Sequence, residues 1–221
     1  MNVAENLKKI KAELPASVTL IAVSKTKPVE LIKEAYDAGQ RDFGENYIQE
    51  LEEKHKQLPT DIRWHAIGHL QSNKVKYIAP FVHLIHAVDS LKLLQEINKQ
   101  ALKNNRVIDC LLQIHIAQEE TKFGFSFVEC EEMFKTEEFK KLQNMRVVGF
   151  MGMATNTDNE TQIKTEFQSL NNFYQKIKGQ NPHISILSMG MSGDYKIAIA
   201  EGSTMIRIGS SIFGERNYNK S

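Results

Sequence analysis

The chain has 221 residues, of which 41% are hydrophobic and 25% are charged, a balance typical of a soluble globular protein with a substantial core. Its 28 basic and 27 acidic residues leave a formal net charge of +1, which gives no electrostatic reason to bind nucleic acid or a membrane surface. The length suits one sizeable domain, and we expect residues 1–221 to form a single one.

The N-terminal segment and the cysteines indicate the compartment. Residues 1–14 are charged throughout, so we expect no signal peptide. No apolar run approaches the roughly 20 residues that a membrane-spanning helix needs. Cys110 and Cys130 lack the spacing of a redox or metal motif and fit reduced structural thiols. We therefore expect a cytoplasmic protein.

Strand-like and helix-like segments alternate along the chain after an amphipathic helix predicted over residues 2–14. The predicted strands, which are short and rich in apolar residues, are 18–24, 41–46, 62–67, 82–88, 107–116, 147–151, 184–189 and 204–208. The predicted helices begin at 28, 47, 73, 90, 127, 137, 159 and 194, and a short apolar turn follows at 212–213.

Fully apolar strands that alternate with helices are typical of a parallel sheet covered on its outer side. Eight such units in this length predict a small (β/α)₈ barrel of the TIM type, with the extra N-terminal helix closing one end. A doubly wound open sheet is the alternative, because periodicity by itself does not separate the two folds.

Functional residues of a barrel lie where its strands end, at one common mouth. The polar residues that fall at predicted strand ends are Lys25, Asn46, His69 or Gln71, Lys122, Ser188, Ser192 and Arg207. We expect the functional site among them.

Two turns rich in glycine and serine stand between strand and helix near the C-terminus. Ser192 and Gly193 follow the seventh strand, and Gly209 and Ser210 follow the eighth. Unblocked N–H groups at two adjacent helix starts would form a phosphate-binding cup. Ordinary strand-to-helix turns are the alternative reading.

Lys25 ends the first strand and shares a face with Ile21 and Val23. A lysine among apolar neighbours has a lowered pKa and forms a Schiff base with an aldehyde. A solvated loop lysine is the alternative, because Lys27 is close by. A reactive lysine opposite a phosphate cup is what a pyridoxal phosphate pocket requires.

Arg207 bears on what such a cofactor would do. A permanent cation at the pyridine nitrogen favours the unprotonated ring and weakens its capacity as an electron sink. Direct binding of phosphate by Arg207, or an ion pair with Glu201, stays equally open from the residues.

The histidines do not predict a metal site. His65 and His69 lie in a segment that begins as a strand, and His83 and His86 are spaced to face opposite sides of one. No cysteine or carboxylate stands beside them at ligand spacing, and we expect no metal.

Five segments in order resemble the pyridoxal phosphate homeostasis proteins, a single-barrel family similar to the N-terminal domain of alanine racemase. These segments are Ala22–Pro28, Phe43–Tyr47, Trp64–Lys74, Leu187–Asp194 and Ile206–Gly214. The resemblance implies pyridoxal 5′-phosphate (PLP) held as a Schiff base on Lys25, with Asn46 beside the ring and Arg207 near the pyridine nitrogen. It implies phosphate contacts from Ser192, Gly193, Gly209 and Ser210, and a second mouth lysine in Lys122.

The sequence departs from the family pattern at three places. His115 stands where the family usually has asparagine, Ala66 replaces a larger apolar residue, and Gly152 interrupts the end of the sixth strand. These departures affect the detailed shape of the mouth.

The chain ends at Ser221, so we expect it to lack the second domain from which a racemase of this type supplies its opposing tyrosine. The resemblance therefore implies intracellular PLP buffering or delivery to PLP-dependent apoenzymes, by a monomer without robust catalysis. A weak PLP-dependent amino-acid racemase is the alternative. A cofactor-free Schiff-base barrel, such as an aldolase acting on a sugar phosphate, is a third.

Overall fold

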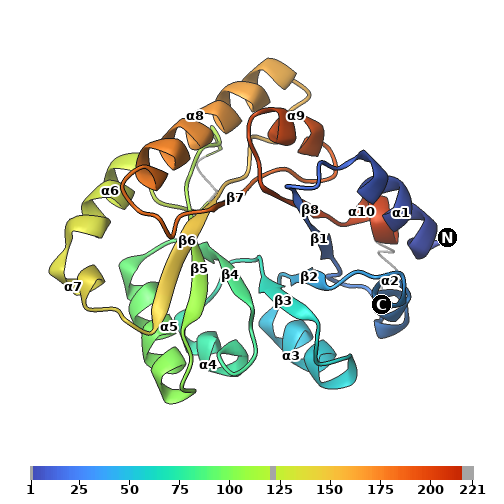
Figure 1. Cartoon of the computed structure of the whole chain (residues 1–221), viewed down its shortest axis with the longest axis horizontal. Coiled ribbons are helices and arrows are strands. Elements are labelled where there is room, and N and C mark those ends of the chain that lie inside the picture. Colours follow the sequence, from blue (N-terminus) through green and yellow to red (C-terminus); the bar gives the residue numbers. More distant parts are fainter. Residues whose placement is uncertain (1, 120–122, 216–221) are drawn as a thin grey trace.

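The structure is a computed structural model that describes residues 2–119 and 123–215. Eight parallel strands form one closed barrel in sequence order, with helices around its outside (Figure 1). The strands are β1 Thr19–Val23, β2 Asp42–Glu45, β3 Arg63–Ala66, β4 Leu84–Val88, β5 Ile108–Gln113, β6 Met145–Met151, β7 Ile186–Ser188 and β8 Met205–Ile208. The barrel closes where β1 pairs with β8, with Thr19 opposite Met205 and Ile21 opposite Arg207. The predicted barrel is confirmed, and the open sheet is wrong.

The helices follow the predicted order, with small shifts at their ends. They are α1 Val3–Glu13, α2 Val29–Asp37, α3 Ile48–Gln57, η1 Ser72–Lys74, α4 Val75–Ile78, α5 Leu91–Lys103, α6 Phe127–Lys135, α7 Glu137–Lys140, α8 Glu160–Lys178, α9 Tyr195–Ala200 and α10 Ser210–Phe213. Ser90 caps α5 by accepting the N–H of Leu93, as serine does before a helix. No helix in the described ranges is long and apolar enough to cross a membrane.

The extra N-terminal helix does not close an end of the barrel, as predicted, but packs in the outer ring between α10 and α2. In Figure 1, α1 lies against α10 at one side of the barrel, and the Asn6 amide donates to the carbonyl of Ile212. Val3, Leu7 and Ile10 are buried beneath α1, which confirms the predicted apolar stripe.

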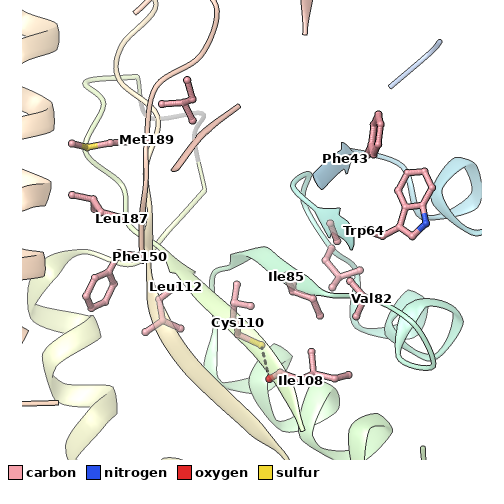
Figure 2. Packing of buried hydrophobic residues seen from close by; sticks show 14 of the residues in the cluster. Phe43, Trp64, Val82, Ile85, Ile108, Cys110, Leu112, Phe150, Leu187 and Met189 are labelled. Carbon is pink, nitrogen blue, oxygen red and sulfur yellow. Dashed lines mark hydrogen bonds between the residues drawn. The ribbon is translucent and has the colours of Figure 1, made fainter. Parts of the chain in front are cut away.

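The core has an outer and an inner part. The outer part fills the space between strands and helices, and Figure 2 shows Trp64, Ile85, Leu112 and Phe150 within it. The inner part lies within the barrel and includes Ile21, Leu111 and Met205. Burial of such side chains removes apolar surface from water and supplies the main stabilisation of the fold.

All strands except β6 are shorter than predicted, and β5 and β7 lose the most residues. β5 stops at Gln113, since Ile114 only bridges to Phe125, and β7 keeps three residues, since Gly190 turns the chain with a φ of +99°. β6 and β7 approach closely because Gly149 has no side chain: a Cβ there would lie 1.8 Å from the carbonyl oxygen of Ile186. Close backbone approach is a position where glycine is needed.

Candidate functional site

A cavity of about 470 Å³ opens where the barrel strands end. It is lined by all the cofactor residues predicted from the sequence: Lys25, Asn46, Ser192, Gly193, Arg207, Gly209 and Ser210. Its size suits a small phosphorylated ligand. The structure thus brings these residues together, while their individual roles stay predictions.

The four other residues predicted for the mouth differ in their positions. His69 lines the cavity, and Gln71 is not among the lining residues. Ser188 is fully buried beneath it, in contact with Arg207. Lys122 lies outside the described residues, so its predicted role has no structural account here.

Lys25 follows β1 and is half-buried. Ile21 lies in the inner core and Val23 lines the cavity, so the predicted alternation along this strand is confirmed. The neighbouring Lys27 has a different task, because its Nζ donates to the carbonyls of Gly214 and Glu215 at 2.9 and 2.8 Å. Lys27 therefore holds the end of the described chain against the mouth.

Buried charges support the backbone on both sides of Lys25. The Lys54 Nζ donates to the Ser24 carbonyl at 2.7 Å, to Glu45 Oε1 at 2.8 Å and to Glu50 Oε1 at 2.6 Å. Glu50 Oε1 also accepts the N–H of Thr26 at 2.6 Å, where the backbone has a φ of +62°. Positive φ is uncommon for threonine and needs support from its surroundings.

Glu45 is the acidic centre of this network. Its side chain is fully buried, and Ser24 donates its hydroxyl to Glu45 Oε1 at 2.5 Å. Burial raises the pKa of Glu45 to about 7, and the nearby Lys54 ammonium opposes that rise. Sequence reasoning missed this network, although the spacing of Glu50 and Lys54 on one helix was a readable signal.

The serine and glycine turns both line the cavity. Ser192 and Gly193 precede α9, and Gly209 and Ser210 begin α10. Within residues 2–119 and 123–215, nothing accepts the N–H groups of Ser192, Gly193, Ser210 or Ser211. A Cβ added to Gly193 would meet no atom within 4 Å, so there is open space beside it. Such N–H groups suit an anion.

Arg207 lies on the floor of the cavity and is 4% exposed. Its Nη1 donates to Ser188 Oγ at 2.6 Å and its Nη2 to the Gly152 carbonyl at 3.3 Å. Burial lowers its pKa to about 10. From the sequence, an ion pair between Arg207 and Glu201 was an open alternative. In the structure, Glu201 Oε1 lies 3.7 Å from Lys164 Nζ instead, and no described carboxylate forms a salt bridge with Arg207.

His69 also reaches the cavity from a predicted strand end. Its ring stacks on Phe123 with centroids 4.4 Å apart, and its Nδ1 lies 3.3 Å from Asp89 Oδ2. The side chain is 45% exposed. Phe123 was not singled out by sequence reasoning, because an exposed aromatic in a loop has no periodic signal.

The histidine arrangement differs from what strand spacing predicted. His65, His83 and His86 lie together, with ring centroids 5.3 Å apart for His65–His83 and 5.2 Å for His65–His86. His83 precedes the first residue of β4, so strand alternation does not apply to it. Asp42 reaches His65 and His83 from the adjacent strand, and ligand atoms of these three residues lie within 4.8 Å of one another. A carboxylate is therefore present that local spacing could not reveal.

The three departures from the family pattern lie at or below the mouth. His115 Nε2 contacts the carbonyl of Glu119 at 2.9 Å, and Ala66 is buried in the outer core. Gly152 follows β6, and a Cβ there would lie 2.6 Å from Leu170. Its carbonyl accepts from Arg207, so this departure bears directly on the site.

The chain matches the family model described as "Alanine racemase, N-terminal domain" over residues 1–217. A pyridoxal phosphate homeostasis protein of Vibrio alginolyticus is 43% identical over 211 residues, which are 93% of this chain and 89% of that protein. Its namesake in Aquifex aeolicus is 41% identical over 90% of this chain and 87% of its own, and that of Escherichia coli K12 is 39% identical over 93% and 89%.

Solved structures agree with this relationship. PipY of Synechococcus elongatus, solved with PLP bound, has a TM-score of 0.86 and 35% identity, and covers 96% of this chain and 100% of its own. An alanine racemase of Clostridium difficile has a TM-score of 0.76 with 17% identity, over 99% of this chain and 57% of its own, a likeness of fold alone. The chain therefore belongs to the pyridoxal phosphate homeostasis protein family.

Proposed function

We propose that the chain binds PLP in the mouth cavity as a Schiff base on Lys25 and serves intracellular PLP homeostasis. One observation carries the proposal: a lysine, an arginine and two serine–glycine turns line a single cavity of about 470 Å³. The names of the relatives and the PLP-bound neighbour PipY support it independently.

The chemistry of the lining residues matches the parts of PLP. The unpaired N–H groups around Gly193 and Ser210 suit the phosphate. Lys25 supplies the amine for the aldehyde: its nitrogen adds to the carbonyl carbon, a C=N bond forms, and the carbonyl oxygen leaves as water. Arg207 has donors only, so it suits an unprotonated pyridine nitrogen. Asn46 lines the same cavity and would lie beside the ring.

Buffering and delivery follow from the same chemistry. An amine from another protein or from solution takes the aldehyde when the C=N bond to Lys25 is hydrolysed or exchanged. Because the cavity is open at the ends of the strands, we propose that PLP-dependent apoenzymes are the recipients of PLP. We propose that the carrier is a monomer. A cationic Arg207 at the ring would weaken its electron-withdrawing capacity, which favours storage over turnover.

Weak amino-acid racemisation is the second candidate, and His69 is the observation that favours it. Exchange of an α-proton on both faces requires a second acid–base group besides the lysine. His69 lines the cavity, and Asp89 lies close enough to orient its imidazole. Proton exchange on bound amino acids that is lost in both Lys25→Ala and His69→Gln would support this candidate.

The test is the visible absorbance spectrum of the purified protein, followed by borohydride reduction and peptide mapping. A yellow protein with a pyridoxyl group on Lys25, and on no other lysine, is the expected result. Lys27→Ala is the matched control and should keep the chromophore, because its Nζ bonds to backbone carbonyls instead. A protein that stays colourless after PLP is added would contradict the proposal and favour the cofactor-free Schiff-base barrel.

The phosphate end can be tested separately. Ser192→Ala combined with Ser210→Ala should weaken binding of PLP more than binding of pyridoxal, which lacks the phosphate. Equal losses for both ligands would contradict the phosphate role. Arg207→Glu should shift the absorbance of bound PLP by allowing the ring to be protonated, and an unchanged spectrum would count against the contact with the ring nitrogen.

A further inference from the structure

A continuous line of hydrogen bonds crosses the barrel interior and ends at Arg207. Asp42 Oδ1 lies 3.0 Å from His65 Nε2, and His65 Nδ1 lies 2.9 Å from His86 Nε2. His86 Nδ1 lies 3.1 Å from Ser188 Oγ, which accepts from Arg207 Nη1 at 2.6 Å. The five residues come from β2, β3, β4, β7 and β8, and none is more than 8% exposed.

The direction of every hydrogen bond in this line follows from its two ends. Arg207 has donors and no acceptor, so Ser188 must accept from it. Asp42 is ionised, because hydrogen bonds from His65 and Arg63 hold the pKa of its carboxyl well below the usual range against desolvation, so it only accepts. His65 therefore carries its proton on Nε2. Burial lowers the pKa of both imidazoles, so each carries a single proton.

The remaining links are then fixed one after another. His65 Nδ1 has no proton and accepts from His86 Nε2, which leaves His86 Nδ1 as an acceptor. The Ser188 hydroxyl must donate to that nitrogen. The protons thus run from Arg207 through Ser188, His86 and His65 to Asp42, with one donor and one acceptor at each contact.

The order of donors and acceptors along the line determines what Arg207 meets at the cavity. Because its own proton is committed to His86, Ser188 presents only lone pairs to Arg207. Each group in the line turns its negative end toward the guanidinium, and the line ends at the Asp42 carboxylate, whose charge is paired with Arg63. Arg207 is buried and no described carboxylate forms a salt bridge with it, although the charge of Asp194 favours its protonated form, so this line of dipoles adds to the compensation of the buried guanidinium.

We infer that Asp42, His65, His86 and Ser188 are positioning residues that hold the Arg207 guanidinium in one orientation at the floor of the cavity. The inference rests on the proposed function only for the group that Arg207 faces, the pyridine nitrogen. The interior of such barrels is usually filled by branched apolar residues. Buried polar residues on five strands are costly to bury and point to a task beyond packing.

A metal ion at Asp42, His65 and His83 is the competing explanation of the same cluster. Arg63 argues against it, because its guanidinium donates from Nε at 2.8 Å and from Nη2 at 2.5 Å to the Asp42 carboxylate. A cation would also replace the proton on His65 Nε2 and break the first link of the line. The two explanations therefore predict different protonation of His65.

The first measurement is ¹⁵N NMR of the PLP-free full-length protein, which reports imidazole tautomers and the rotation of arginine side chains. We expect a proton on Nε2 and none on Nδ1 for both His65 and His86. We also expect resolved Nη signals for Arg207, since its rotation is restricted. A proton on Nδ1 of either histidine, or displacement of the His65 Nε2 proton by one equivalent of Zn²⁺, would overturn the inference.

Variants then test whether the line acts on Arg207 at a distance. His86→Leu should merge the Nη signals of Arg207, although His86 and Arg207 share no hydrogen bond. His86→Gln should also merge them, and this second variant keeps a polar group in the buried site. Ser188→Ala should have the same effect. His83→Asn is the matched control and should change nothing, because His83 lies outside the line. Unchanged Arg207 signals in His86→Leu or His86→Gln would overturn the inference.

The loaded protein provides a separate readout. His86→Leu should keep a borohydride-reducible group on Lys25, bind PLP about fivefold more weakly and shift its absorbance, since one oriented hydrogen bond is worth roughly 1 kcal/mol. If the wild type forms no chromophore, the proposed function fails while the NMR results still decide the inference. A normal spectrum and affinity in His86→Leu would overturn the inference while the proposed function stands.

Discussion

Replacement of Lys54 by methionine tests the buried charges behind Lys25. Lys54 is 5% exposed and donates to Ser24, Glu45 and Glu50 at 2.6–2.8 Å. Methionine keeps most of the volume but leaves Glu45 without its cation. Removal of one member of a buried ion pair typically costs about 3–5 kcal/mol. We expect Lys54→Met to lower the free energy of unfolding by that amount at pH 8.

The loss should depend on pH with a defined sign. The pKa of Glu45 is about 7 in the folded chain against an ordinary value of 4.5, so its contribution to stability is complete below pH 4.5 and is lost as the pH rises to about 7. Without Lys54 the folded pKa rises further, and the loss continues above pH 7 at about 1.4 kcal/mol per pH unit. The cost of Lys54→Met should therefore be about 1.4 kcal/mol larger at pH 8 than at pH 6.

Urea unfolding at the two pH values measures this difference through the fluorescence of Trp64, the only tryptophan in the sequence, which is buried. Lys56→Met is the matched control on the same helix, because its pair with Glu52 is exposed and should contribute less than about 1 kcal/mol. The double variant Glu45→Gln with Lys54→Met should lose the extra pH dependence. Equal losses in the two single variants, or a cost of Lys54→Met that does not change with pH, would refute the reasoning.

Three further predictions follow from burial and close contact. Gly149→Ala should abolish soluble folding or lower the thermal midpoint severely, because its Cβ would lie 1.8 Å from the Ile186 carbonyl, whereas Gly193→Ala should fold normally; equal midpoints would contradict this contact. Gly68→Ala should weaken PLP binding, measured by titration, because its Cβ would lie 2.5 Å from the Asn46 carbonyl, and unaltered binding would show that Asn46 need not stay in place. Burial raises the pKa of Cys130 to about 12 and that of Cys110 further, so a thiol reagent at pH 8 should label neither cysteine in the native protein and both in urea; rapid labelling of the native protein would be inconsistent with this burial.

Much of the fold could be predicted because its elements are encoded locally. The apolar stripe of α1, the serine cap of α5 and the strand pattern of β1 each follow from a few neighbouring residues. The ends of strands were less predictable. β7 stops at Ser188 because Gly190 turns the chain, and this turn depends on the positive φ of Gly190 rather than on hydrophobicity.

The cavity residues were also predictable, for a topological reason. In a closed parallel barrel every strand ends at the same mouth, so Lys25 from β1 and Arg207 from β8 meet although 182 positions separate them (207 − 25). Once the barrel is inferred, the polar residues at strand ends are assembled without knowledge of any side-chain contact.

Contacts between side chains inside the barrel could not be predicted from the sequence. The meeting of His65, His86 and Ser188 depends on strand register and on which side chains reach across the interior, and Asp42 joins them from another strand. The placement of Glu45 over Lys54 likewise depends on how α3 packs against β2. By itself, then, the sequence determined the order of elements, the barrel and the set of residues at its mouth, because these depend on local periodicity and on a topology that brings strand ends together. Only the tertiary structure decided which buried charges are paired and which way their protons point, because these depend on contacts of a few ångströms between residues distant in the chain.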